Sequence, residues 1–462
     1  MESISTERTA LSTYVARARQ QELPGEVRER ATLHILDTLA AIISGSGMAA
    51  SLAGRRWAER VFGTADSGPA TVFGASHGTT VAAALCNGMA AHADETDDSH
   101  METHSHPGCA VVPAAVAAAE DVDASGPELL RAVAAGYDVG CRIGRAAGLA
   151  HSDIRTGHRS SHALVGAFGA AAAAAVLYGL DDAEVRYALS YTAQLTSGVT
   201  TWMRDTDHIE KAFVFAGMPA SQGMLAVSLV NAGCTGVADV FSGSPNWLEA
   251  VSSHPDRTTL SKGLGSDYEL LRGTLKKYSV GSPAQAAVEA VVEMMRDDGL
   301  SHHGVRHIEI KLPSSSYVIV DNRSMPNINV QYLVAGTLID GKFSFSMAHD
   351  AERMRSPGIV DLVSKTELLP DESIKGTRDA VVTVQRDGAE GPVTHTRHVG
   401  HVRGTPALPM TAGEVRAKAM DLIAVTRDRG RAEQFCDAVI SLGEQPSVRT
   451  LISQIGKLWR HQ

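Results

Sequence analysis

The sequence predicts a mostly helical protein in which a smaller α+β domain is inserted into a large all-helical domain. Three observations support this fold class. Apolar residues recur at helical spacing in the first part of the chain, strand-like patterns gather in its later middle, and helical spacing returns at the end. We therefore expect a helical domain over residues 1–272, an α+β lid domain over 273–409, and the rest of the helical domain over 410–462.

The amino-acid composition agrees with this organisation. The chain has 462 residues, enough for two domains, and its 44% hydrophobic and 20% charged residues are typical of a globular protein. Only 5% of the residues are aromatic. In contrast, 43 residues are glycine, and alanine forms long runs. Small side chains in such numbers predict helices that pack at close approach.

The first domain contains one helix signal after another. Pro24-Gly25-Glu26 places a proline and an acid at the start of a helix, VRERATLHILDTLAAIISG, which we expect to end at Gly45. Strand signals are almost absent from this part of the chain. Further helices are predicted in TTVAAALCNGMAAHA, CAVVPAAVAAAE, PELLRAVAAGYDVGCRIGRAAG, DDAEVRYALSYTAQLTSG and MPASQGMLAVSLVNAG.

One segment just reaches the length of a transmembrane helix. ALVGAFGAAAAAAVLYGL, from Ala163 to Leu180, carries no charge over eighteen residues. Nearly half of it is alanine, which adds little transfer free energy, and polar and charged residues flank it on both sides. We expect a fully buried helix of the helical domain.

The lid domain mixes helix and strand patterns. PAQAAVEAVVEMMRDDG and INVQYLVAGTLIDG have helical spacing, whereas HIEIKLP and SYVIVDN alternate or run β-branched, which predicts strands. AVVTVQRDGAEGPVTHTRHVG predicts a β-hairpin with a loop rich in Gly and Asp. After residue 410, GEVRAKAMDLIAV and ISLGEQPSVRTLISQIGKLWR return to helix.

Charge and cysteine content exclude several classes of protein. The 42 basic and 52 acidic residues give a net charge of −10 without a block of like charge, so we expect neither a nucleic-acid nor a membrane partner. Five separated cysteines without a C-x-x-C pattern predict buried thiols rather than disulfides, zinc or iron–sulfur ligands. Because MESISTERTALSTYVARARQ also lacks the apolar core of a signal peptide, we expect a cytoplasmic protein.

The stretch HADETDDSHMETHSHP, residues 92–107, concentrates acids and histidines. It can be interpreted as a metal site, as an acid/base site, or as a solvated loop. The spacing of its donors matches neither H-E-x-x-H nor a calcium loop, and its position between two apolar helices suits a cavity as well as water. Adjacent carboxylates raise one another's pKa and imidazole titrates near neutrality, so the group can both take and give a proton. The candidate metal ligands are His92, Glu95, Asp97, Asp98, His100, His104 and His106.

The pattern H-x-x-[DE]-x-D-D-[ST] followed by H-P resembles the first signature of the MmgE/PrpD family, which includes 2-methylcitrate dehydratase, cis-aconitate decarboxylase and iminodisuccinate epimerase. The resemblance extends through nearly the whole chain. It includes Gly157-His158 ahead of Gly166-Ala-Phe-Gly169, Lys211 ahead of Gly217-Met-Pro-Ala220-Ser-Gln-Gly223, Lys276-Lys277-Tyr278, and Tyr317 in SSSYVIVDNR.

This resemblance implies functional residues. Those with implied catalytic roles are His106, His158, Glu95, Asp97 and Tyr317. Those with implied roles in substrate binding are Lys211, Lys276, Ser99 and His162. Taken singly, the lysines would be assigned to the surface, the tyrosine to the edge of the core, and His158 and His162 to helix caps or the core.

The sequence departs from the family pattern at several of these positions. Glu95 stands where many members have Asp, and Ser99 where they often have Thr. His162 competes with His158 for the role of second histidine. Lys211 lies one residue further from its glycines than in the family pattern, and Val214 replaces the usual histidine after it. We expect these changes to bear on which acid is bound.

The implied function is that of a lyase, without cofactor or metal, that acts on a small di- or tricarboxylate by acid/base proton transfer. Because the cysteines cannot hold an iron–sulfur cluster, the leaving group must be protonated by His106 or by an acid of the Glu95–Asp97–Asp98 group. Dehydration of a 2-methylcitrate-like hydroxy acid is the first expectation, and decarboxylation of a cis-aconitate-like acid or epimerisation of a dicarboxylate are the alternatives. A metal-dependent hydrolase and a non-catalytic acid-binding protein represent other classes. The resemblance also implies a homodimer.

Overall fold

The computed structural model describes residues 6–62, 68–148, 158–375, 378–424 and 428–459. The chain divides into two compact units. The first comprises residues 1–93, 97–274 and 422–462, and the second comprises residues 94–96 and 275–421. The mostly helical fold with a small mixed sheet in its later part confirms the predicted fold class.

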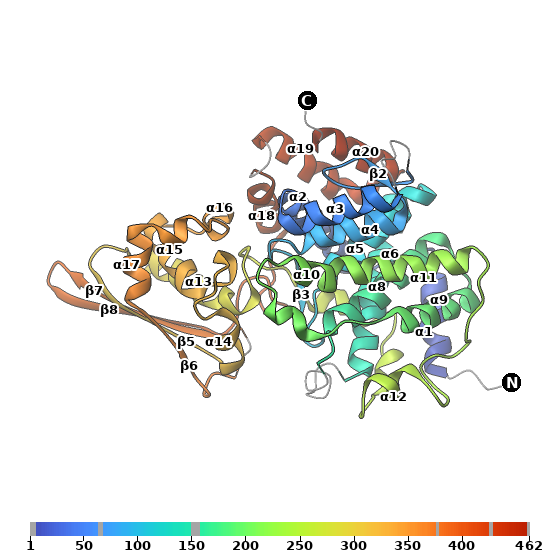
Figure 1. Ribbon diagram of the computed structural model, residues 1–462, viewed down its shortest axis with the longest axis horizontal. Helices are drawn as coiled ribbons and strands as arrows, with labels where there is room; N and C mark the ends of the chain where they lie inside the picture. Colours follow the sequence, from blue (N-terminus) through green and yellow to red (C-terminus); the bar gives the residue numbers. More distant parts are fainter. Residues whose placement is uncertain (1–5, 63–67, 149–157, 376–377, 425–427, 460–462) are drawn as a thin grey trace. The chain divides into compact units, whose positions relative to one another are not determined.

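The first unit consists almost entirely of helices (Figure 1). Its strands are two residues long: β1 (Ala70–Thr71) pairs with β2 (His77–Gly78), and β3 (Ser99–His100) pairs with β4 (Gly273–Thr274). Its helices are α1 (Thr6–Ala18), α2 (Gly25–Gly45), α3 (Ala49–Phe62), α4 (Thr80–Ala91), α5 (Gly108–Val122), α6 (Gly126–Ala146), α8 (Ser161–Tyr178), α9 (Asp182–Leu195), α10 (Ile209–Ala212), α11 (Met218–Asn231), α12 (Trp247–Val251), α19 (Arg429–Ile440) and α20 (Val448–Trp459), with α18 (Ala412–Ala424) crossing the boundary between the units.

Helix α8 packs against α5, α6 and α11, and its residues 163–177 are all buried. Glycine makes this packing possible, because a Cβ atom on Gly169 would lie 2.9 Å from the carbonyl oxygen of Gly136 in α6. By length and composition alone, α8 and the run Ile209–Asn231 would suffice to cross a membrane, but 83% of the α8 span is buried inside the protein. The prediction of a buried helix at Ala163–Leu180 is therefore confirmed.

Local signals set several helix ends. Helix α2 begins after Pro24 and ends at Gly45, as predicted. A Cβ atom at Gly45 would lie 2.0 Å from the carbonyl oxygen of Ala90, so glycine permits the end of α2 to contact the end of α4. Capping boxes begin α6, at Ser125, and α9, at Asp181, where each cap side chain accepts a backbone N–H three residues on.

The second unit is built on a four-stranded sheet of order β6-β5-β7-β8. The predicted strand at HIEIKLP and the predicted hairpin are confirmed, and one buried face results from the alternation of Ala380, Val382 and Val384 with less buried residues in β7. In Figure 1, α13, α15 and α17 lie along one side of this sheet. The elements are α13 (Gln285–Asp297), β5 (Val305–Leu312), α14 (Ser314–Val320), α15 (Val330–Asp340), α16 (Phe345–Ala348), α17 (Pro357–Ser364), β6 (Thr366–Pro370), β7 (Ala380–Gly388) and β8 (Gly391–Val399).

The prediction of a strand at SYVIVDN is wrong, because residues 314–320 form the helix α14. Pro313 occupies its N-cap position and cannot continue the ladder of β5. Packing then outweighs the β-propensity of the three β-branched residues: Ser316 and Val320, one helical turn apart, are buried, whereas Val318 is 64% exposed. Strand β6 shows the opposite error, since TELLP was not predicted but pairs in parallel with β5.

Candidate active site

The acidic and histidine-rich stretch joins α4 to α5, and its first part is buried. No residue from His92 to His100 is more than 7% exposed. A buried carboxylate must find hydrogen-bond donors or a positive charge, because it loses its water. The interpretation of these residues as a solvated loop is therefore wrong.

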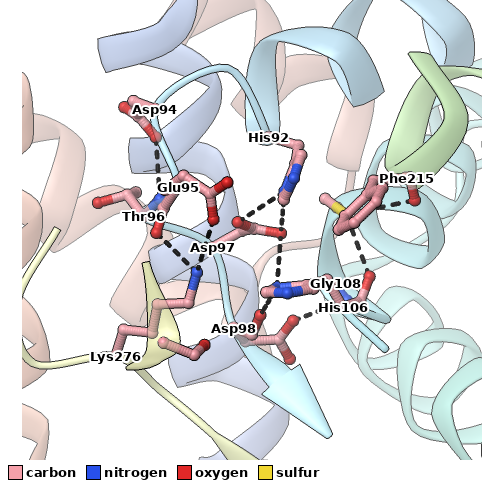
Figure 2. A network of polar contacts seen from close by, with 12 residues as sticks. His92, Asp94, Glu95, Thr96, Asp97, Asp98, His106, Gly108, Phe215 and Lys276 are labelled. Atoms are coloured by element: carbon pink, nitrogen blue, oxygen red, sulfur yellow. Dashed lines mark hydrogen bonds and ion pairs between the residues drawn. The ribbon is translucent and has the colours of Figure 1, made fainter. Parts of the chain in front are cut away.

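Asp97 is the acceptor between two imidazoles of the first unit (Figure 2). The Nδ1 atom of His92 lies 3.0 Å from both carboxylate oxygens, and Nδ1 of His106 lies 3.4 Å from Oδ2. The two rings meet edge to face with centroids 5.1 Å apart. His208 supports His92, because its Nε2 lies 2.9 Å from the carbonyl oxygen of His92. Sequence patterns did not single out His208, which lies 116 residues further along the chain.

His106 is the member of this group that reaches the surface. Its side chain is 11% exposed, whereas that of Asp97 is fully buried. His106 lies outside any helix or strand, directly before Pro107, which takes the N-cap position of α5 with φ −65° and ψ −38°. A histidine that precedes a helix in this way presents its ring from a loop, in line with the role implied for it.

Of the two candidate second histidines, the structure places His162 beside His106. The rings of His162 and His106 are stacked with centroids 5.1 Å apart, and His162 also stacks on Phe215 at 3.5 Å. Burial, and after it the charges of the neighbouring His106, His92 and Lys211, lower the pKa of His162 well below its ordinary value. His162 is therefore neutral at pH 7. His158 is exposed and has a left-handed backbone with φ 55°, and Gly157 of the same motif lies outside the described residues.

Lys211 lies in α10, and its ammonium group is 5.2 Å from the centroid of the Phe215 ring. Lys211 and His162 thus both lie against the ring of Phe215, although 49 residues separate the two in the sequence. Directly after α10 comes a π-helical turn, η2 (Phe213–Gly217), which contains Val214. A π-helical turn holds an extra residue within a helix.

Glu95 and Lys276 meet within the second unit. Residues 94–96 belong to this unit, and Nζ of Lys276 donates to the carbonyl oxygen of Glu95 at 2.6 Å and lies 3.8 Å from its carboxylate (Figure 2). Glu95 has a left-handed backbone with φ 61°, which is rare for a residue with a side chain and persists only where neighbours hold it. Lys276 is only 1% exposed.

Three further side chains hold the same short loop, and the sequence had not indicated them. Each of the carbonyl oxygens of residues 94–96 accepts a hydrogen bond from the second unit. Asp94 accepts from Asn327 at 3.2 Å and lies 2.9 Å from Nε2 of His349, and Thr96 accepts from Lys418 at 2.8 Å. The donors lie more than 230 residues away in the sequence, so no local pattern could have found them.

The remaining two predicted residues have mainly structural surroundings. Ser99 is buried in β3, where it pairs with Thr274. Tyr317 lies in α14, half-buried against the hydrophobic core of the second unit. The charge of Asp321, and a hydrogen bond to it, raise the pKa of Tyr317.

His92, Asp97 and His106 form one group whose ligand atoms lie within 4.8 Å of one another, close enough to hold a metal ion. However, their donors are directed at acceptors within the protein. Nδ1 of His92 faces Asp97, and Nδ1 of His106 lies 2.5 Å from the carbonyl oxygen of Asp98, so each of these nitrogens carries a proton. A metal ion bound through Nδ1 would have to replace these hydrogen bonds, whereas one bound through Nε2 would not.

Comparison with known proteins agrees with the fold. The model of the MmgE/PrpD N-terminal domain matches residues 9–259, and that of the MmgE/PrpD C-terminal domain matches residues 278–442. The chain therefore belongs to the MmgE/PrpD family. A cis-aconitate decarboxylase-like protein, oryM, of Aspergillus oryzae is 23% identical over 96% of both chains. A cis-aconitate decarboxylase of Aspergillus terreus is 24% identical over 93% of this chain and 92% of its own.

Proposed function

We propose that this protein is a lyase that acts on a small di- or tricarboxylate by acid/base proton transfer, without a cofactor. The observation that carries the proposal is the group in which His106, backed by the buried carboxylate of Asp97, lies beside neutral His162 and near Lys211. The family assignment supports a carboxylic acid as substrate. The charges in the group suit such a molecule, because a lysine can neutralise a carboxylate.

In this proposal His106 exchanges the proton of the reacting carbon. A carboxylate that accepts from an imidazole stabilises the cation formed when the other nitrogen takes a proton, so Asp97 makes His106 a better base. In a dehydration, the carbon next to a carboxylate loses a proton and the hydroxyl group leaves as water after gaining one. His162 is kept neutral by its surroundings and does not supply this proton, so protonated His106 returns to the hydroxyl group the proton that it took from carbon.

Dehydration of a 2-methylcitrate-like hydroxy acid is the finer proposal, and decarboxylation of a cis-aconitate-like acid is the second candidate. The relatives of this chain favour decarboxylation, because two of them are named as cis-aconitate decarboxylase or decarboxylase-like proteins. In that reaction a carboxylate leaves as carbon dioxide and its bonding electrons are taken up by a proton delivered to carbon. Both reactions need the same proton carrier beside a polycarboxylate.

Proton NMR in deuterated water separates the candidates in one experiment. A panel of hydroxy and unsaturated di- and tricarboxylates is incubated with the protein, and the substrate and product signals are followed. Loss of water, loss of carbon dioxide and exchange at a stereocentre each give a different spectrum. A panel in which no acid is converted and none exchanges deuterium would contradict the proposal and favour a protein that only binds acids.

A further inference from the structure

A second buried group lies behind the site, centred on Asp98. His34 of α2 and Tyr137 of α6 both reach its Oδ2 atom: the Tyr137 hydroxyl donates at 2.6 Å and Nδ1 of His34 lies 2.9 Å away. The backbone N–H of Gly108 donates to Oδ1 at 2.9 Å. All three side chains are fully buried. Every oxygen of the Asp98 carboxylate is therefore held by a donor, and each donor comes from a different helix.

The protonation states of the group follow from this geometry. Burial disfavours the charged form of Asp98, but the hydrogen bonds from His34 and Tyr137 lower its pKa below the ordinary value. Burial lowers the pKa of His34. The consistent assignment is an anionic Asp98 and a neutral His34 that donates its Nδ1 proton, with the Tyr137 oxygen 3.1 Å from the same nitrogen.

Asp98 also contacts both neighbours of Pro107. Its carbonyl oxygen lies 2.5 Å from Nδ1 of His106, and its carboxylate accepts from Gly108. Gly108 admits no side chain here, because a Cβ atom would lie 2.7 Å from the Tyr137 hydroxyl and 2.8 Å from Oδ1 of Asp98. One buried residue thus determines where the backbone turns into α5 and where the His106 ring points.

The contacts of His106 decide which of its nitrogens carries the proton. The Asp98 carbonyl and, at 3.4 Å, the Asp97 carboxylate are both on the Nδ1 side, and both are acceptors only. A neutral imidazole that donates from Nδ1 has its lone pair on Nε2. The orientation of the ring is therefore coupled to its chemistry.

We propose that Asp98, held by His34 and Tyr137, is a positioning residue that keeps His106 in the Nδ1–H tautomer, so that Nε2 is the nitrogen that exchanges a proton with the substrate. Only the last clause rests on the proposed function. The tautomer is a property of the resting protein and can be measured without a substrate.

The first measurement uses the unmodified protein. Long-range proton–nitrogen NMR of protein labelled with ¹⁵N-histidine distinguishes a protonated from an unprotonated ring nitrogen, and the signals of His106 are those missing from the His106→Gln spectrum. We expect a protonated Nδ1 and an unprotonated Nε2. A wild-type His106 protonated at Nε2 instead would overturn the proposal, whether or not any variant folds.

Two variants then test Asp98 and its partners. Tyr137→Phe removes one donor with little change in shape, and Asp98→Asn weakens acceptance from both partners. We expect both tautomers of His106 to be populated in the variants, and kcat to fall about 10- to 100-fold with little change in KM, the effect typical of losing a group that orients a catalytic one. If stability falls in both variants while His106 keeps the wild-type tautomer, the group is only structural and the proposal is wrong.

Tyr14→Phe is the matched control. Tyr14 donates at 2.9 Å to Asp138, a buried acid that follows Tyr137 in α6, so this substitution also removes a tyrosine hydroxyl from a buried aspartate. It should lower stability comparably and leave both the His106 tautomer and kcat unchanged. A protein with the expected tautomer that converts no polycarboxylate would contradict the proposed function and leave the role of Asp98 intact.

Discussion

At the scale of the residue, His106 and His162 differ in basicity because different groups lie near their Nδ1 atoms. His106 has the Asp98 carbonyl at 2.5 Å and the Asp97 carboxylate at 3.4 Å, whereas Nδ1 of His162 has no hydrogen-bond partner among the described residues. A histidine backed by a carboxylate is the better base, whereas the lowered pKa of His162 keeps that ring neutral. Two rings 5.1 Å apart therefore have different chemistry.

His106→Gln is expected to reduce kcat by ~10³-fold or more, because glutamine can hydrogen-bond but cannot carry the proton. Binding of the acid should persist, since Lys211 is unaffected, and calorimetric titration would measure it. The matched control is His398→Gln, which alters an exposed histidine 3.0 Å from Asp379 and should leave activity unchanged. A His106→Gln protein with more than a tenth of wild-type activity would exclude His106 as the proton carrier.

Lys276→Ala is expected to lower kcat/KM by at least ~10²-fold. Because Lys276 is buried and donates to the carbonyl oxygen of Glu95, the free energy of unfolding should also fall, by about 1–3 kcal/mol. Lys277→Ala is the control: Nζ of Lys277 pairs with Glu289 at 2.9 Å, and loss of this lysine should leave kcat/KM unchanged. Comparable loss of activity in both variants would show that the fold, and not the Lys276 ammonium, is responsible.

At the scale of the element, a buried acid connects α5 to β1. Glu120 is 3% exposed and accepts from the backbone N–H of Thr71 at 2.9 Å and from its hydroxyl at 2.6 Å. Burial outweighs these hydrogen bonds and raises the pKa of Glu120 to about 7. As the pH rises towards neutrality, Glu120 therefore begins to ionise, and a negative charge is then buried between α5 and β1.

The pH dependence of stability should report this contact. The folded-state pKa of Glu120 lies above the unfolded value, so its contribution is present at low pH and is lost as the pH rises through about 7. Between about pH 5 and about pH 8, the free energy of unfolding of the wild type should fall by roughly 2 kcal/mol more than that of Glu120→Gln. Urea unfolding at both pH values measures this difference in the free energy of unfolding. An equal pH dependence of the two proteins would contradict the raised pKa of Glu120.

Elements also show where sequence patterns mislead. The β-branched run in SYVIVDN predicted a strand, yet α14 forms because a helix buries Ser316 and Val320 together. Helices α2, α4, α5, α6 and α11 were predicted within a few residues, since periodic apolar residues and their end signals are local in the sequence.

At the scale of the whole molecule, the chain is an MmgE/PrpD protein of two compact units, with the loop 94–96 grouped with the second unit and its flanking residues with the first. Four of the five cysteines are buried, and Cys234 is partly exposed. The homodimer and the cytoplasmic location remain predictions, and light scattering would test the first of them.

Dialysis against a strong chelator is expected to leave the activity of the whole protein unchanged, because the proposed proton transfer by His106 uses no metal ion. Emission spectroscopy before and after dialysis measures the metal content alongside the activity. Activity that disappears with the chelator and returns with zinc or manganese would make the group of His92, Asp97 and His106 a metal site and refute the proton-transfer mechanism.

The sequence by itself determined the fold class, the family and the stretch that contains the candidate site, because helical periodicity, end signals and the signature around residues 92–107 all lie within short segments. Tertiary structure alone decided which partners surround that stretch. His162 rather than His158 lies beside His106, Tyr137 and His34 enclose Asp98, and Lys418 holds Thr96. These contacts join residues up to 322 positions apart, and they form because buried polar groups must find partners among whatever side chains packing brings within reach.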